Sequence, residues 1–170
     1  IEPIQGEAGI IVPADDYLPR VRAVCTERNV LMIADEIQSG LARTGRTFAC
    51  DHWGVVPDIY LLGKALGGGV VPVSAVVANK DILGVLHPGE HGSTFGGNPV
   101  CTAAALAVLR TLADDDLIAR AALLGKSLSE GIEALGHPLV DHVRGRGLLL
   151  GIVLTAAAGK AVETAARDAV

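Results

Sequence analysis

The chain has 170 residues, of which 50% are hydrophobic and 19% are charged. This balance supports a sizeable core and excludes an intrinsically disordered chain. The net charge of −5 provides no basic excess for nucleic acid, which we exclude as a partner. The longest uncharged stretch, residues 92–109, opens with glycine, serine and asparagine. We therefore expect no membrane span, which needs about 20 predominantly apolar residues.

Cysteine usage and the first residues bear on location and completeness. The three cysteines are an odd number and widely spaced, which predicts reduced thiols rather than a disulfide framework. No basic segment followed by an apolar one opens the chain, and we expect a cytoplasmic protein. The chain begins Ile-Glu-Pro, without methionine, and its first residues resemble the end of a core strand. We therefore expect a fragment of a longer protein.

The first half of the chain predicts alternating helix and strand. Residues 2–4 resemble the end of a strand, and residues 13–28 predict a helix. Continuous apolar runs, typical of strands buried on both faces, follow at 30–34, 58–62 and 73–78. A helix followed by a buried strand is the βαβ pattern, so we expect an α/β fold with a mainly parallel sheet.

After residue 99 the sequence becomes rich in alanine and leucine. We expect a helix over 101–112 and a second helix that begins at the acidic triplet 114–116 and reaches about residue 135. Residues 136–138 predict a turn, and residues 143–150 lead into one final strand. The tail from residue 155 predicts a helix.

Asp35 is the first candidate for chemistry. It follows the apolar run at 30–34, at the expected carboxyl end of a strand. In open α/β sheets ligands bind beyond the carboxyl ends of strands, where a carboxylate can face a cationic group. The alternative is an aspartate that forms a turn or caps a helix, and the residue by itself favours that alternative.

Lys64 is the second candidate. It follows the run at 58–62 and precedes the apolar, glycine-rich residues 65–69. Removal from water makes a lysine amine a usable nucleophile toward aldehydes. The alternative is a surface lysine whose stem packs on apolar neighbours. Both interpretations remain open.

The third candidate is the loop 91–99, where Ser93 and Thr94 stand among glycines. Hydroxyls and successive backbone amides in such a loop can bind phosphate, although an ordinary surface loop has the same composition. The neighbouring residues 87–91 match the H-x-x-E-H pattern of a zinc peptidase class. That pattern requires a helix, which Pro88 breaks, so we expect no metal site.

These three features are more specific together than alone. They fit an aldehyde cofactor that carries a phosphate and a ring nitrogen, and that cofactor is pyridoxal 5'-phosphate (PLP).

Four segments resemble the class III aminotransferases, PLP-dependent enzymes of fold type I. They read EPIQGEAG at 2–9, IADEIQSG at 33–40, LGKAL at 62–66 and GEHGSTFGGNP at 89–99. The resemblance extends to about residue 152 and is strongest toward the ornithine aminotransferases. These transfer the terminal amino group of L-ornithine to 2-oxoglutarate and give glutamate semialdehyde. Relatives that act on acetylornithine or 4-aminobutyrate share much of the pattern and remain alternatives.

The resemblance implies roles for the cofactor-binding residues. Lys64 matches the lysine that holds PLP covalently and then moves a proton between substrate and cofactor carbons. Asp35 matches the carboxylate that pairs with the pyridine nitrogen and keeps the ring protonated. Gln38 matches a residue near the phenolic oxygen of the cofactor. Thr94, together with Ser93, matches a phosphate contact donated across a dimer interface.

Glu7 matches a residue of the substrate site. In ornithine aminotransferases this glutamate pairs with an arginine of the small C-terminal domain. The pairing masks the arginine in one half-reaction and frees it for 2-oxoglutarate in the other. It therefore favours transfer from the terminal amine over transfer from the α-amine.

The resemblance also implies that parts of the enzyme lie outside this sequence. It assigns 1–135 to a partial PLP-binding large domain and 136–170 to the truncated start of the small domain. The phosphate-binding turn, the aromatic that stacks on the pyridine ring and the small-domain arginine have no match here. We expect a homodimer or a complex with a complementary N-terminal chain that covers exposed strand edges. The alternative is an inactive remnant.

Overall fold

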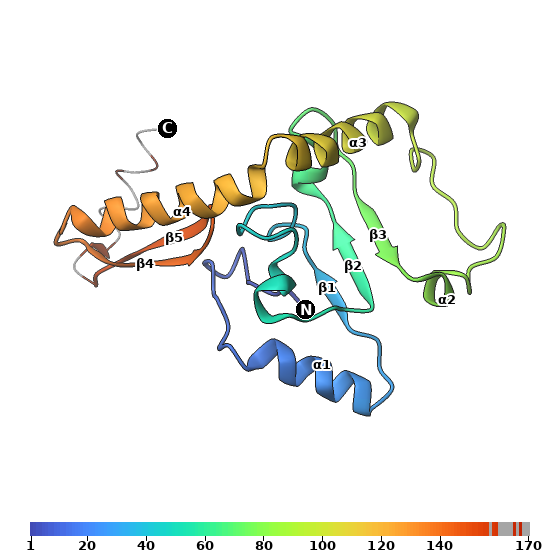
Figure 1. Ribbon diagram of the computed structural model, residues 1–170, viewed down its shortest axis with the longest axis horizontal. Helices are drawn as coiled ribbons and strands as arrows, with labels where there is room; N and C mark the ends of the chain where they lie inside the picture. The colour runs from blue at the N-terminus through green and yellow to red at the C-terminus, as the bar shows by residue number, and fades with distance from the viewer. Residues whose placement is uncertain (157, 160–164, 166, 168–170) are drawn as a thin grey trace.

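The centre of the computed structural model is a three-stranded sheet (Figure 1). The structure describes residues 1–156, 158, 159, 165 and 167, so the helix expected over the tail lies largely outside the described residues. The sheet contains β1 (Ile33–Asp35), β2 (Ile59–Leu62) and β3 (Ala75–Ala78), in that order. All three lie within or at the edge of the apolar runs that predicted strands.

The pairing of the strands confirms one part of the topology and corrects another. β1 and β2 are parallel, as predicted, with Asp35 opposite Leu61. β3 runs antiparallel to β2, with Ala75 opposite Leu62. The connection between them contains only the short 3-10 helix η2 (Lys64–Gly67), whereas a parallel return usually requires a crossover helix.

The first residues of the chain lie along the outer edge of β1. The amino group of Ile1 donates to the Ile33 carbonyl at 2.9 Å, and the Asp35 amide donates to the Ile1 carbonyl at 2.8 Å. Residues 2–4, predicted as the end of a strand, are not assigned to a strand. Only Ile1 makes strand-like hydrogen bonds to β1. Residues Gln5 and Ile11 then form an isolated antiparallel bridge that closes the loop between them.

Helix α1 (Tyr17–Glu27) covers one side of this region. It begins four residues later than predicted, with Pro19 in the first turn, where the missing amide hydrogen costs little. Its buried Leu18 packs with Met32 and Val55 in one core cluster. The cluster attaches the helix to the segment that enters β1 and to η1 (Ala49–Trp53).

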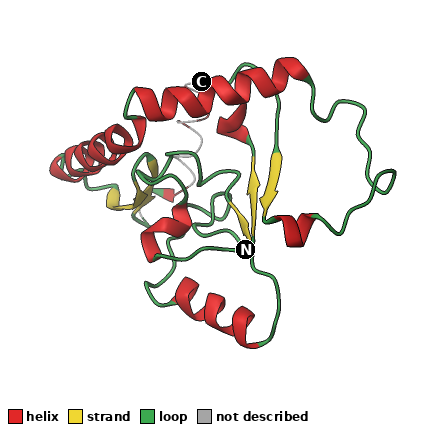
Figure 2. Cartoon of the chain, turned by 45° about the vertical axis from the view of Figure 1, so that its right-hand side comes forward, coloured by secondary structure: helices red, strands yellow, loops and turns green. Residues whose placement is uncertain are grey.

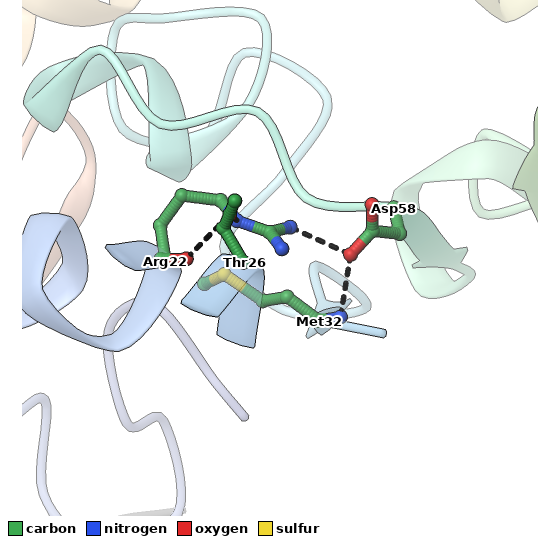
Figure 3. A network of polar contacts seen from close by, with 4 residues as sticks. All are labelled: Arg22, Thr26, Met32 and Asp58. Atoms are coloured by element: carbon green, nitrogen blue, oxygen red, sulfur yellow. Dashed lines mark hydrogen bonds and ion pairs between the residues drawn. The ribbon is translucent and has the colours of Figure 1, made fainter. Parts of the chain in front are cut away.

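Asp58, directly before β2, ties α1 to the entry of both parallel strands (Figure 3). Its Oδ2 accepts hydrogen bonds from Arg22 Nη1 and from the Met32 amide, each at 2.6 Å. Arg22 also donates through Nε to the Thr26 hydroxyl at 3.2 Å. The bond from Arg22, and then the bond from the Met32 amide, lower the pKa of the Asp58 carboxyl.

The second half of the chain is helical and ends in a hairpin. Helices α3 (Pro99–Asp114) and α4 (Leu117–Ala134) follow one another along one side of the molecule (Figures 1 and 2). Asp116, with φ of 50°, separates them. The strands β4 (Val140–Arg146) and β5 (Leu149–Leu154) form an antiparallel hairpin against α4, where the sequence predicted one final strand. The predicted domain boundary at residue 136 falls in the turn before β4 and stays a prediction.

A short helix, α2 (Lys80–Leu83), precedes a loop of residues 84–98 that projects away from the sheet in both views. Asn98 ends this loop and begins α3, where its side chain accepts hydrogen bonds from the amides of Val100 and Cys101. Among the described residues, no helix combines the length and apolar character that crossing a bilayer requires.

The Asp58 contacts predict a pH-dependent loss of stability. Replacement of Asp58 by Asn should lower the free energy of unfolding by about 1 to 2 kcal/mol at neutral pH, because hydrogen bonds to a charged acceptor are weakened. The pKa of this carboxyl is lower in the folded state. Its contribution is therefore present above about pH 4 and is lost as the pH falls through the folded pKa.

Urea unfolding of parent and variant at pH 7 and at pH 3 measures this effect. Asp16→Asn is the control, because Asp16 forms an exposed ion pair with Arg20 of the kind that contributes little. A difference between parent and Asp58→Asn that is the same at both pH values would contradict the prediction.

Candidate active site

Asp35 and Lys64 lie at the same edge of the sheet. Asp35 is the last residue of β1, and Lys64 is the second residue after its parallel neighbour β2. Carboxyl ends of parallel strands meet at one edge, which is where α/β sheets bind ligands. The carboxylate of Asp35 also accepts a hydrogen bond from the Ile37 amide at 3.0 Å. It therefore shapes the turn after β1 as well, which is the alternative that the sequence left open.

The turns that follow the two strands are in contact. A side chain at Gly63 would come within 3.3 Å of Ile37, so the backbone before Lys64 packs directly on the turn after Asp35. Leu62 and Leu66, on either side of Lys64, are buried in a second core cluster with Leu41. The backbone around Lys64 is thus anchored from both directions.

Lys64 itself has an unusual backbone conformation. Its φ of 43° lies in the left-handed region, which costs a residue with a side chain about 1 to 3 kcal/mol. Such conformations cluster at functional sites, where the surrounding structure holds them. The side chain is exposed within this chain, whereas the sequence predicted an apolar neighbourhood. The apolar residues Ala65 to Gly69 continue the chain after Lys64 and do not bury its side chain.

A cavity of about 810 Å³ opens beside Lys64. It lies between the turn after β2 and the start of α3, and its polar lining includes the hydroxyls of Ser74, Ser93 and Thr102. Ser93 accepts a hydrogen bond from the Gly96 amide at 2.9 Å, which bends the loop at that point. Thr94 is exposed on the same loop and lies outside the lining. The structure thus brings Ser93, but not Thr94, to the cavity of Lys64.

Glu7 and Gln38 form a direct pair. Gln38 Nε2 donates to Glu7 Oε1 at 3.0 Å, and it joins the turn after β1 to the loop closed by Gln5 and Ile11. Gly6 allows this approach, because a side-chain carbon there would collide with the Gln38 amide. The carboxylate of Glu7 is exposed and accessible to a ligand. The sequence named both residues but gave no sign that they contact each other.

Glu36 is a site residue that sequence reasoning missed. It is 1% exposed, and its carboxylate accepts hydrogen bonds from the Ser39 hydroxyl at 2.6 Å and from the amides of Ala49 and Cys50 at 3.0 and 2.9 Å. These bonds anchor the segment after β1 to η1. Alternation could have found it, because neighbours in an extended strand face opposite sides. If Asp35 faces the ligand edge, Glu36 faces the core.

The buried environment of Glu36 also affects Cys50. Burial raises the pKa of the Cys50 thiol, and the charge of Glu36 raises it further. A protonated, buried thiol is a poor nucleophile, so Cys50 is a packing residue. All three cysteines are free, in agreement with the prediction of reduced thiols.

Comparison with known proteins matches almost the whole chain to one family. The family described as aminotransferase class-III matches residues 1–169. The acetylornithine aminotransferase of Mycolicibacterium smegmatis is 59% identical over 169 residues, which are 99% of this chain and 43% of that protein. The ornithine aminotransferase of Bacillus subtilis is 55% identical over 157 residues, 92% of this chain and 39% of that protein. The chain therefore spans about two fifths of the length of these relatives.

Solved structures match in the same way. The ornithine aminotransferase of Toxoplasma gondii, with partial occupancy of PLP at its active site, has a TM-score of 0.88 and 48% identity, covering 93% of this chain and 38% of that one. The acetylornithine aminotransferase of Elizabethkingia anophelis has a TM-score of 0.87 and 51% identity, covering 91% and 39% of the two chains. These neighbours confirm the predicted fold type.

Glu36 provides a test of how the site is held in place. Replacement by Gln should lower the free energy of unfolding by about 2 kcal/mol or more, because the new NH₂ group faces one of three donors and leaves it unsatisfied. Urea unfolding measures the change. The control is Glu27→Gln at an exposed position of α1, with an effect within about 0.5 kcal/mol. Equal effects at the two positions would show that the buried contacts of Glu36 contribute nothing.

Proposed function

Since the chain belongs to the class III aminotransferase family, we propose that it carries the lysine and aspartate side of a PLP-dependent active site. One observation supports this most strongly. Asp35 ends β1, Lys64 is the second residue after the parallel strand β2, and the turns that follow the two strands pack on each other at one edge of the sheet. An anionic group and an amine are thereby held at the same ligand-binding edge.

The residues at this edge fit the cofactor. PLP has an aldehyde, a phosphate and a ring nitrogen, and when bound it supplies an electron-accepting ring for amino-group transfer. The amine of Lys64 is exposed and lines the cavity, where it is accessible to an aldehyde. The hydroxyl of Ser93 lines the same cavity and suits a phosphate oxygen. We propose that Thr94 of one subunit contacts the phosphate of the cofactor bound in the other subunit.

Each protein group has a distinct task in this proposal. The Lys64 amine first holds the cofactor and, once displaced by the substrate amine, holds and returns the proton that moves during transfer. The Asp35 carboxylate would pair with the ring nitrogen and favour its protonated form. Gln38 lies in the same turn, and its side-chain amide would contact the phenolic oxygen of the cofactor. The bond between Gln38 and Glu7 joins the turn after β1 to the loop that carries Glu7, which we assign to the substrate site.

We propose L-ornithine as the amino donor and 2-oxoglutarate as the acceptor. Glu7 supports this assignment. Its exposed carboxylate lies beside the turn after β1, where it can pair with a cationic group of the assembled enzyme. While the two are paired, the cationic group cannot bind a substrate carboxylate, so the pair controls which substrate the site accepts. A second candidate donor is acetylornithine, favoured by the similarity to the Mycolicibacterium smegmatis enzyme. 4-Aminobutyrate is a further alternative.

We also propose that the working site forms by association, either of two copies or with a complementary N-terminal chain. Within the described residues β3 pairs only with β2, and its Val76 and Val77 are exposed. An open strand edge with exposed valines favours pairing with another segment. The loop with Ser93 and Thr94 projects from the body, where another subunit can reach it. The free cysteines support a reducing compartment, the cytoplasm.

The visible absorbance of the protein with added PLP tests the role of Lys64. The band of lysine-bound PLP should appear in the parent and disappear in Lys64→Ala, because only this lysine lines the cavity within the described residues. Lys80→Ala, at the start of α2, is the matched control and should keep the band. An unchanged band in Lys64→Ala would refute covalent attachment at this residue.

A panel of amino donors tests the substrate. In the protein assembled with an N-terminal part of the enzyme, kcat/KM should be highest for L-ornithine, and Glu7→Gln should lower it about tenfold, or about 1.4 kcal/mol. A preference for acetylornithine would replace the donor assignment with the second candidate. Binding of PLP without transfer to any donor would favour the inactive remnant.

A further inference from the structure

We propose that Arg144 is a positioning residue of this site, which fixes from β4 the loop of residues 6–10 that carries Glu7. The inference rests on the proposed function, because Glu7 is the group whose placement matters. Its structural basis is a contact between two segments that are 135 residues apart in the chain. Neither the motif around Glu7 nor the hairpin sequence indicates this contact.

The contact is a hydrogen bond to the backbone of the loop. Arg144 Nε donates to the Gly9 carbonyl oxygen at 2.8 Å, in a part-buried position. A charged donor makes such bonds shorter and stronger than those between neutral groups. No carboxylate among the described residues forms an ion pair with Arg144, so the bond to Gly9 is the polar contact that orients its side chain.

The backbone conformation of the loop explains why the bond from Arg144 to Gly9, called the clamp from here on, is needed at this point. Ile10 has a φ of 58°, which is a clear outlier for a β-branched residue. The Gly9 carbonyl belongs to the peptide plane between Gly9 and Ile10, which is one of the two planes that define φ of Ile10. Holding the carbonyl oxygen therefore fixes the orientation of that plane. The Ile10 amide is held from the other side by the Gly6 carbonyl at 3.1 Å. Without Arg144, the loop can relax toward ordinary φ values and carry Glu7 with it.

The second strand of the hairpin supports the same loop. A side-chain carbon at Gly151 would lie 3.3 Å from the Ile10 Cβ and 3.4 Å from the Gly9 carbonyl oxygen, so β5 lies close against the loop at this point. On its opposite side the loop is bound through Glu7 to Gln38. Glu7 is therefore held between the turn after β1 and the hairpin.

Three variants of the full chain separate the hydrogen bond from the charge. Arg144→Met keeps the apolar stem and removes the donor. Arg144→Gln places its amide nitrogen the same number of bonds from the backbone as Nε, so it keeps a donor and loses the charge. Arg146→Met makes the same change two residues along β4, where the guanidinium lies over Trp53 and approaches Asp15 instead of the loop.

Hydrogen–deuterium exchange at residues 5–11 is the first measurement, because the amides of Gly9, Ile10 and Ile11 are bonded within this loop. Arg144→Met should raise their exchange rates about tenfold or more, whereas Arg144→Gln and Arg146→Met should stay close to the parent. The second measurement is amino transfer in the assembled enzyme. Arg144→Met should raise KM for the amino donor severalfold with a smaller effect on kcat, and Arg144→Gln should restore most of the loss.

Unchanged exchange in Arg144→Met would overturn the proposal, and so would an Arg144→Gln variant that exchanges as fast as Arg144→Met. Glu7→Gln separates this outcome from a failure of the proposed function. It should lower transfer without changing exchange, and a fully active Glu7→Gln would refute the role of Glu7 while leaving the clamp intact. Should Arg144→Met fail to fold, Arg144→Lys takes its place, because lysine keeps the charge and has a methylene at the position of Nε, and it should raise exchange at the same amides. Unchanged exchange there would overturn the proposal.

Discussion

The parallel register of β1 and β2 is the constraint on which the rest of the site depends. It puts Asp35 opposite Leu61 and so brings the residues after each strand to one edge. The register is set at the other end of the strands, where one oxygen of Asp58 accepts from Arg22 and from the Met32 amide. A shift by one residue would reverse the faces of the shifted strand and separate the carboxylate from the amine.

The turn after β1 is where the other segments of the site meet. Asp35 closes the turn on the Ile37 amide, Glu36 enters the core to bind η1, and Gln38 reaches out to Glu7. Ile37 packs on Gly63 and so connects the turn to the backbone of Lys64. Four successive residues thus point to four different partners. Because these contacts share one short backbone segment, a disturbance at one of them displaces the others.

Much of this could be predicted from local sequence, but the long-range contacts could not. The apolar runs located the three strands. They also indicated Asp35 and Lys64, because a residue that follows an apolar run along the chain stands at the carboxyl end of that strand. The strand β3 was predicted, but its antiparallel direction was not, because the apolar content of a run does not indicate which way the strand runs. The pair of Glu7 and Gln38 and the bond from Arg144 to Gly9 join residues far apart in the chain, and one sequence contains no signal for such distances. Glu36 was missed because its neighbour Asp35 offered the more obvious carboxylate.

Lys64 and Ile10 are two strained backbone positions near the site, with φ of 43° and 58°. Lys64 carries the amine that the proposed chemistry requires, Ile10 lies in the same loop as Glu7, and each costs stability that glycine would not. Glycine at position 64 would remove the amine, so the strain there cannot be relieved without loss of the proposed chemistry. At position 10 the side chain packs against the hairpin, so glycine would relieve φ but weaken the contact that orients Glu7. The buried residues Leu62 and Leu66 offset the first cost, and Arg144 offsets the second. At both positions the conformation that places the reactive group lowers the stability of the fold. The contacts of the surrounding residues determine whether that conformation is kept.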